Sequence, residues 1–227
     1  MTALPPLDDT AVEASTTPLD EAALHTPLHE KHENSTSEVL ILTCHSDPKS
    51  LCYKNASLLR ARAEYLGYSV TQVEAMDFPV LRLRGEGVNT DAFDDMAERL
   101  TRVRHLVLCY PMWNYSAPAM VKNWLDATLR AEQHFYFNSH GVPVGLIPHL
   151  RVHLIHTTGG PRWYYRLFSS NNLSRKLIQR IFRMCGVPRR QVHERLLGSM
   201  ARLEGQSLER HLQQWFGELS VYQFDQN

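Results

Sequence analysis

Residues His45–Cys52, with the sequence HSDPKSLC, bring hydroxyl groups and a lysine to the start of an expected helix. Unpaired backbone N–H groups and the helix dipole both favour an anion at such a position, so this segment could bind a phosphate group. The alternative is that Ser50 simply caps the helix. The Walker pattern G-x-x-x-x-G-K-[ST] does not occur in the sequence, which disfavours nucleotide hydrolysis.

Two further segments could contact a ring. Residues Pro111–Pro118, with the sequence PMWNYSAP, place two large aromatic residues and a methionine between prolines. They suit a flat, apolar ring with polar edges, unless they plug the end of a sheet as core aromatics. Residues Thr157–Gly160, with the sequence TTGG, contain adjacent glycines. Adjacent glycines let the backbone approach a ligand, although a plain turn would look the same.

Alternating strands and helices must position these segments. Apolar runs predict strands at residues 39–44, 68–73, 105–110, 151–156 and 191–197. Helical periodicity predicts helices at residues 55–66, 91–102, 118–130, 172–184 and 203–219. The alternation indicates an α/β fold with a doubly wound, five-stranded parallel sheet. Right-handed crossovers leave few strand orders, and the flavodoxin-like order 2-1-3-4-5 is one of them.

The expected fold brings the three segments together at one end of the sheet. Sheets of this kind bind ligands beyond the carboxyl ends of their strands, beside the point where the strand order reverses. The three segments follow the first, third and fourth predicted strands. Together they offer contacts to a phosphate, to an aromatic ring and to polar ring edges. That combination describes a flavin mononucleotide.

Composition limits the other classes of function. A hydrophobic fraction of 43% is that of a globular protein, and a formal net charge of zero gives no indication of nucleic-acid binding. The sequence has no run of eighteen apolar residues and no signal-peptide pattern, so we expect a cytoplasmic protein without a transmembrane segment. The four cysteines show no CxxC spacing, so neither a zinc site nor a disulfide framework is expected.

Residues 1–37 differ from the rest of the chain. They hold seven acidic residues against one lysine, four prolines and few large apolar residues. We predict a disordered acidic arm at 1–37, followed by a flavin-binding domain at 38–222. His25, His29 and His32 have a helix-like spacing that could bind a metal, but Pro27 lies inside it, and we prefer a polar tail without a metal.

The three segments also resemble a known family, the flavodoxin-like NAD(P)H:quinone oxidoreductases, which include DT-diaphorase and the FMN-dependent azoreductases. His45-Ser-x-x-x-Ser50 is similar to the phosphate loop of the diaphorase branch. Pro111-Met-Trp-Asn114, continued by Pro118-x-x-x-Lys122-x-Trp124-x-Asp126, is similar to the azoreductase ring loop and its helix. Residues 157–160 are similar to the diaphorase ring loop. The likeness extends from about Glu38 to Leu219.

The resemblance implies a set of contacts to the flavin. Those on the phosphate-bearing side would be His45, Lys49, Ser50, Leu51 and Cys52. Those to the ring would be Pro111, Met112, Trp113, Asn114 and Tyr115, with Thr157, Thr158, Gly159 and Gly160 at its pyrimidine edge. Donors from Thr158 through Gly160 would stabilise negative charge on the reduced flavin. We assign the catalytic contacts to Gly159, Gly160 and Tyr165, because diaphorases carry a tyrosine beside the nicotinamide at the position of Tyr165.

Two departures from the family pattern stand out. Cys52 occupies the position of a usual diaphorase asparagine, which removes one amide contact. Asn171 occupies the position of the diaphorase active-site histidine, so a tyrosine–histidine proton relay is not expected. The basic stretch Asn171–His193 could steer NADPH or bind a partner, but a solvated face over a core stripe is the preferred interpretation. That stripe would consist of Leu173, Leu177, Ile178, Ile181 and Phe182.

The resemblance implies a flavin-dependent NAD(P)H:quinone oxidoreductase that could also reduce azo or other acceptors. NAD(P)H would give a hydride to bound FMN, with FAD as the alternative flavin, and the acceptor would then take two electrons at the same face. Family members are usually homodimers, so a homodimer is implied as well. The alternative function is a flavin-bound regulatory subunit, comparable to the ancillary proteins of glutathione-gated potassium efflux systems.

Overall fold

The computed structural model describes residues 36–81, 91–167 and 170–225, without the side chains of residues 36 and 166–175. The predicted arm, with its three histidines, therefore lies outside the described residues except at positions 36 and 37. The side chains of Leu173 and Asn171 lie outside them too. None of the helices in the described part of the chain is long and apolar enough to span a membrane.

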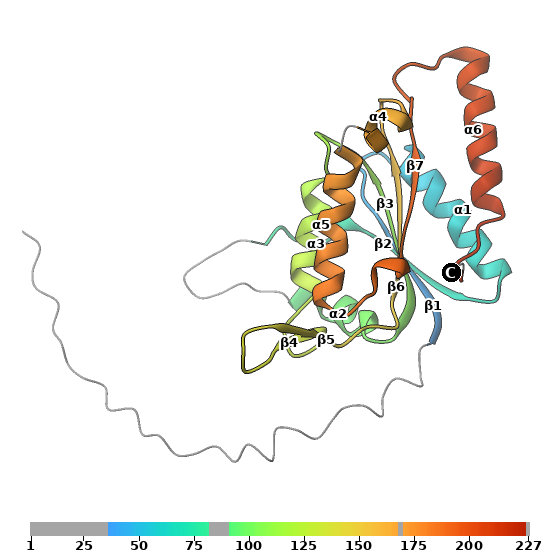
Figure 1. Cartoon of the computed structure of the whole chain (residues 1–227). Helices are drawn as coiled ribbons and strands as arrows, with labels where there is room; N and C mark the ends of the chain where they lie inside the picture. Colours follow the sequence, from blue (N-terminus) through green and yellow to red (C-terminus); the bar gives the residue numbers. More distant parts are fainter. Residues whose placement is uncertain (1–35, 82–90, 168–169, 226–227) are drawn as a thin grey trace, which may run out of the picture. The chain divides into compact units, whose positions relative to one another are not determined.

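Five parallel strands form the sheet of Figure 1. They are β1 (Thr36–Thr43), β2 (Ser69–Glu74), β3 (Val103–Pro111), β6 (Arg151–Thr157) and β7 (Val192–Leu197). Their spatial order is β2-β1-β3-β6-β7. Counted among these five strands, this is the predicted order 2-1-3-4-5, which is confirmed. The first strand begins two residues inside the predicted arm.

Helices cover both faces of the sheet (Figure 1). One face carries α1 (Leu51–Tyr65) and α6 (Gly205–Ser220), and the other carries α2 (Asp94–Leu100), α3 (Ala119–Thr128) and α5 (Ser170–Met184). Alternate strand residues are buried under each layer; Leu40 and Leu108 lie on the α3 side, and Val39 and Ile41 on the α1 side. Burial on both faces is why the strands read as continuous apolar runs.

Several short elements were not predicted. A two-stranded antiparallel hairpin joins β4 (Phe135–Phe137) to β5 (Pro143–Gly145), and α4 (Arg162–Leu167) follows β6. Single 3₁₀ turns occupy η3 (Ala75–Asp77), η4 (Asp91–Phe93) and η5 (Arg189–Gln191). Elements of three to six residues are too short to show a period in the sequence.

Three details of the prediction need correction. The first helix begins at Leu51 rather than at Asn55, so part of the predicted phosphate loop is its first turn. Leu177 was assigned to the buried stripe of α5, but its side chain is 43% exposed, whereas Ile178 and Phe182 are buried. The core also continues beyond residue 222, because Phe224 is buried against the α1 and α6 layer.

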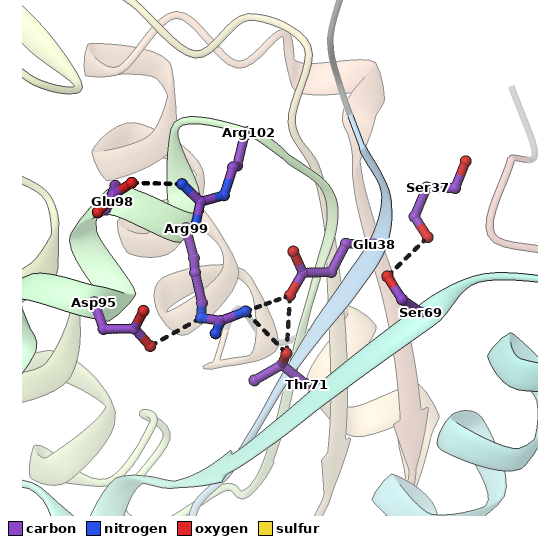
Figure 2. Close-up of polar contacts among 8 residues, drawn as sticks. All are labelled: Ser37, Glu38, Ser69, Thr71, Asp95, Glu98, Arg99 and Arg102. Carbon is purple, nitrogen blue, oxygen red and sulfur yellow. Dashed lines mark hydrogen bonds and ion pairs between the residues drawn. The ribbon is translucent and has the colours of Figure 1, made fainter.

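An ion pair joins α2 to the first two strands (Figure 2). Arg99 donates to Glu38 Oε1 over 2.9 Å, to the Thr71 hydroxyl over 3.2 Å and to Asp95 over 2.8 Å. The Thr71 hydroxyl in turn donates to Glu38 over 2.8 Å. The Glu38 side chain is only 10% exposed. Its carboxylate therefore relies on hydrogen bonds from Arg99 and Thr71 in place of water.

This dependence predicts a loss of stability in Arg99→Met. The substitution leaves the Glu38 carboxylate without its counter-ion, so we expect the free energy of unfolding to fall by about 2–3 kcal/mol, moderated because Arg99 is partly exposed. The matched control is Arg102→Met, which breaks an exposed pair with Glu98 and should cost about 0.5 kcal/mol or less. Urea unfolding measures both values, and equal losses would contradict the role given to Glu38.

Candidate flavin site

A cavity of about 260 Å³ lies at the carboxyl ends of β1, β3 and β6, where the three segments meet. Its lining residues are His45, Ser50, Leu51, Cys52, Pro111, Met112, Trp113, Thr157, Thr158, Gly159 and Met200. All of them except Met200 belong to the predicted site. Lys49, Asn114, Tyr115, Gly160 and Tyr165 do not line the cavity.

Ser50 shows how the first segment could meet an anion. It occupies the N-cap position of α1, yet its side chain makes no capping hydrogen bond. Its Oγ atom is buried and has no hydrogen-bond partner among the described residues. The N–H groups of the first turn of α1 have no carbonyl four residues earlier within the helix. The capping alternative is therefore not what the structure shows, and an anion could satisfy the hydroxyl and the N–H groups together.

The rest of this loop is fixed by Asp47. The Asp47 N–H donates to His45 Nδ1 over 2.9 Å, which leaves the proton of a neutral His45 ring on Nε2. The carboxylate of Asp47 accepts the Lys49 N–H over 2.8 Å. This turn leaves Lys49 exposed and outside the cavity lining, so the structure does not bring this predicted contact to the site.

The second segment makes a tight turn after β3. Trp113 and Ser116 exchange two backbone hydrogen bonds of 2.9 Å. Between them, Asn114 and Tyr115 have φ angles of 45° and 65°. Such left-handed conformations suit asparagine but are uncommon for tyrosine. Both residues are exposed.

Trp113 itself remains at the cavity. Its side chain is 55% exposed, so it does not plug the sheet as a core aromatic. It meets the His45 ring edge-on, with 6.3 Å between ring centroids, and so links the ring segment to the phosphate segment. The Met112 side chain, in contrast, is buried, although it also lines the cavity.

The third segment is held from both sides. Thr157 O accepts the Met112 N–H over 2.8 Å, and the Thr158 N–H donates to Leu197 O over 2.9 Å. The Thr158 N–H is therefore not free to meet a flavin, which corrects the predicted run of donors. No hydrogen bond in the described part of the chain uses the N–H groups of Gly159 and Gly160.

The loop after β7 completes this support. The carbonyls of Thr158, Gly159 and Gly160 accept N–H groups over distances of 3.2, 3.1 and 2.7 Å. The donors are Met200, Ala201 and Ser199, in that order. These hydrogen bonds hold the carbonyls of the glycine pair toward the loop after β7.

Tyr165 lies beside the glycine pair. A Cβ atom on Gly160 would come within 2.8 Å of its ring, so the absence of a side chain there makes room for the tyrosine. Its ring centroid lies 6.2 Å from that of Tyr115. A hydrogen bond with Tyr164 raises the pKa of Tyr115, and Trp163 is 56% exposed nearby on α4. These aromatic side chains form a rim beside the predicted ring site.

Comparison with known proteins agrees with this fold. The family described as having a flavodoxin-like fold matches residues 37–217. The chain belongs to this family.

Curated members of similar sequence share a common description. An FMN-dependent NADH:quinone oxidoreductase from Mycoplasmoides gallisepticum is 36% identical over 74 residues, which is 32% of this chain and 38% of the relative. One from Metamycoplasma arthritidis is 32% identical over 101 residues, which is 44% of this chain and 50% of the relative. The chain thus matches half or less of the length of these relatives.

A solved structure gives the same fold. The FMN-dependent NADH-azoreductase of Bacillus anthracis, in complex with FMN, superposes with a TM-score of 0.64. The match covers 81% of this chain and 97% of the azoreductase, at 18% sequence identity. At this level of identity, the similarity establishes the flavodoxin-like fold.

Two contributions to the site were missed from the sequence. Met200 enters the cavity from the loop after β7, which also lies at the carboxyl end of the sheet. The position of this loop after a predicted strand is the sequence signal for Met200. The aromatic residues Trp163 and Tyr164 directly precede Tyr165 on a six-residue helix that follows Pro161. A proline next to an aromatic run could have indicated the helix start.

Cys52 is not a nucleophile in this setting. Burial raises the pKa of its thiol to about 12, although a hydrogen bond with Thr157 opposes the shift. Burial likewise raises the pKa of Cys44 to about 11. A protonated thiol at the cavity wall is neutral, so it adds no charge that would repel a phosphate.

We therefore expect the native protein to resist thiol reagents. At pH 8 the thiolate fraction of a thiol of pKa 12 is about 10⁻⁴, against roughly a quarter for a free cysteine, so labelling of Cys52 should be about a thousandfold slower than in the unfolded chain. Absorbance at 412 nm with Ellman's reagent measures the rate. In guanidinium chloride all four thiols should react rapidly. Rapid labelling of Cys52 in the native protein, located by mass spectrometry, would contradict the burial argument.

Proposed function

We propose that the chain is a flavin-dependent NAD(P)H:acceptor oxidoreductase that binds FMN in the cavity and reduces quinones, azo compounds or related acceptors by two electrons. The observation that carries the proposal is the buried, unpartnered Ser50 hydroxyl at the start of α1, on the wall of a cavity that also holds Trp113. The names of the curated relatives supply the class of donor and acceptor.

The residues present fit the cofactor. Ser50 Oγ and the free N–H groups of the first turn of α1 would hold the phosphate. Met112 and Trp113 would flank the ring, and the N–H groups of Gly159 and Gly160 would meet its pyrimidine edge. When bound, the flavin supplies the two-electron redox chemistry, and no nucleophile of the protein is required.

The protein would contribute position and polarity. The hydrogen bonds from the loop after β7 fix the glycine pair, so its N–H groups need no rearrangement to stabilise negative charge at the ring edge. The exposed aromatic rim offers flat surfaces on which a nicotinamide or a planar acceptor can stack. Tyr165, which packs against Gly160, is the rim residue placed nearest to the glycine pair by the described contacts.

The alternative, a flavin-bound regulatory subunit of a potassium efflux system, finds no support among the relatives reported above, which are oxidoreductases. A homodimer and a cytoplasmic location are further proposals, and they rest on the family resemblance and on the composition of the sequence. FMN is preferred to FAD because the matched relatives are named for it.

The direct test is spectroscopic. The purified protein, supplied with FMN, should be yellow, should bleach when NADH or NADPH is added without oxygen, and should regain its colour when a quinone is added. Chromatography of the released flavin separates FMN from FAD. A protein that binds neither flavin would overturn the proposal, and one that binds FMN without turning over would favour the regulatory alternative.

Two substitutions separate the phosphate contacts from the ring contacts. Ser50→Ala removes one hydroxyl from a charge-assisted anion site, so it should weaken FMN binding by about 1.5–3 kcal/mol, roughly ten- to a hundredfold, and leave the reduction rate of bound flavin nearly unchanged. Gly159→Val adds a branched side chain whose Cβ atom would lie 3.2 Å from the Ala201 Cβ atom, so flavin occupancy and reduction rate should both fall. Flavin titration and stopped-flow reduction measure the two effects.

The controls follow from the local contacts. Ser57→Ala changes an exposed serine on the same helix and should leave FMN affinity intact. Because Ser50 makes no capping bond, Ser50→Ala should also leave the stability of the flavin-free protein within about 0.5 kcal/mol, whereas loss of a true cap costs about 1 kcal/mol. If Ser50→Ala slowed reduction and left affinity intact, the serine would have to be placed beside the ring.

A further inference from the structure

A second cluster of ionisable side chains lies on the α1 and α6 face of the sheet, toward the amino ends of the strands. His105 on β3 and His153 on β6 are 0% and 1% exposed. The ring of His193 on β7 stacks on His153 at 5.3 Å, and these two residues are register partners. Two buried histidines on neighbouring strands, with the half-buried His193 beside them, are not needed for a flavin site at the other end of the sheet.

The histidines form a directed chain of hydrogen bonds. His105 Nδ1 lies 3.0 Å from His153 Nε2, and His153 Nδ1 lies 2.8 Å from the Tyr222 hydroxyl. The carboxylate of Asp225 faces His105 Nε2 at 3.6 Å, which favours a proton on that nitrogen. His105 Nδ1 must then accept from His153, and His153 must accept from Tyr222.

This chain anchors the C-terminal segment, defined here as residues 221–225. Asp225 accepts hydrogen bonds of 2.9 Å from Arg104 and from Arg151, and it is hydrogen-bonded to the Tyr68 hydroxyl. Phe224 is buried and packs edge-on against both buried histidine rings, at 5.4 and 5.5 Å. The backbone carbonyl of Tyr222 accepts from Arg62 at the end of α1.

We propose that the two buried histidines and the C-terminal segment form a proton-operated latch, in which protonation of His105 and His153 releases residues 221–225 from the sheet. The geometry is the reason. With both rings protonated, His105 Nδ1–H and His153 Nε2–H would point at each other across 3.0 Å, and neither ring would keep an acceptor for its neighbour. One proton leaves an acceptor between the rings but puts a positive charge in the buried cluster, and a second proton removes that acceptor as well.

Burial, and after it the nearby cationic groups, oppose protonation of the two histidines as long as the segment is bound. Burial, reinforced by Arg104, Arg151 and His193, lowers the pKa of His105 to about 4, against the attraction of Asp225. Burial, with the charges of His105, His193, Arg151 and Arg195, holds the pKa of His153 well below its ordinary value. Tyr68 and Tyr222, the remaining titratable groups of the cluster, stay protonated, because burial raises their pKa values.

Asp225 does not titrate in the same range. Burial acts to raise the pKa of its carboxyl, but the hydrogen bonds from Tyr68 and Arg104 outweigh it and hold that pKa below the ordinary value. The carboxylate therefore stays ionised above pH 4. The pH response of the latch between pH 5 and 8 must come from the histidines.

The sign of the response follows from linkage. Once released, the histidines face water and regain a pKa near 6.5, so release is coupled to proton uptake only below that pH. Above pH 7 the segment should stay bound. When the pH falls from 7.5 to 5.5, each histidine raises the equilibrium constant for release of residues 221–225 about tenfold. The two histidines together should therefore raise this constant about a hundredfold.

Hydrogen–deuterium exchange of the purified full chain can measure this opening. The protection factor of a peptide that covers residues 220–225 should fall about a hundredfold between pH 7.5 and 5.5, after correction for the intrinsic effect of pH on exchange. A peptide from the centre of β3 should keep its protection over the same range. Constant protection of the C-terminal peptide, or parallel loss in both peptides through global unfolding, would overturn the latch.

Variants that cannot titrate give the second test. In the double variant His105→Gln/His153→Gln, each glutamine keeps a donor and an acceptor, and the pH dependence of opening should disappear. The single variant His105→Gln, which disturbs the core less, should retain about a tenfold change. His140→Gln removes an exposed histidine from the β4–β5 turn and should behave as the unmodified protein does. Unaltered pH dependence in His105→Gln would refute the assignment even if the double variant failed to fold.

Discussion

The hydrogen bond from the Met112 N–H to Thr157 O, 2.8 Å long, is the contact on which the proposed site depends. It extends the pairing of β3 with β6 past its last register pair, Pro111 with Thr157. Two loops that are over forty residues apart in the sequence therefore leave the sheet side by side. A shift of one residue in this register would turn every side chain of the shifted strand to the opposite face and would displace the aromatic segment relative to the glycine pair.

A parallel sheet has chemically different ends, and this chain places different groups at each. At the carboxyl ends, the unpartnered Ser50 hydroxyl and the exposed Trp113 side chain line an open cavity beside the glycine pair. Toward the amino ends, the C-terminal segment covers His105 and His153, and its own Asp225 is ion-paired with Arg104 and Arg151. The first arrangement leaves hydrogen-bonding capacity for a ligand, whereas the second has its capacity largely satisfied within the protein.

α6 connects these two ends. It follows the loop that supports the glycine pair and leads directly into the C-terminal segment. Along its length it packs on α1, and Trp215 donates to the buried Asn55 side chain over 2.9 Å. The first turn of α1 borders the cavity, so one helix pair contacts both the proposed flavin site and the latch. The hydrogen bond between Trp215 and Asn55 specifies how α6 packs on α1, because buried hydrogen-bonded side chains favour a single arrangement.

The sequence by itself determined the five strands and the three loops, because strands buried on both faces appear as apolar runs such as residues 39–44. It limited the strand order to a few alternatives, and the tertiary structure decided among them. Tertiary structure decided which loop residues face the cavity. Lys49 was predicted to reach a phosphate but is exposed, since the Asp47 carboxylate fixes the turn before it. Met200 and the latch joining His105 to Asp225 also lay beyond the sequence pattern. These contacts depend on strand register and on backbone hydrogen bonds between distant segments, and local periodicity carries no information about either.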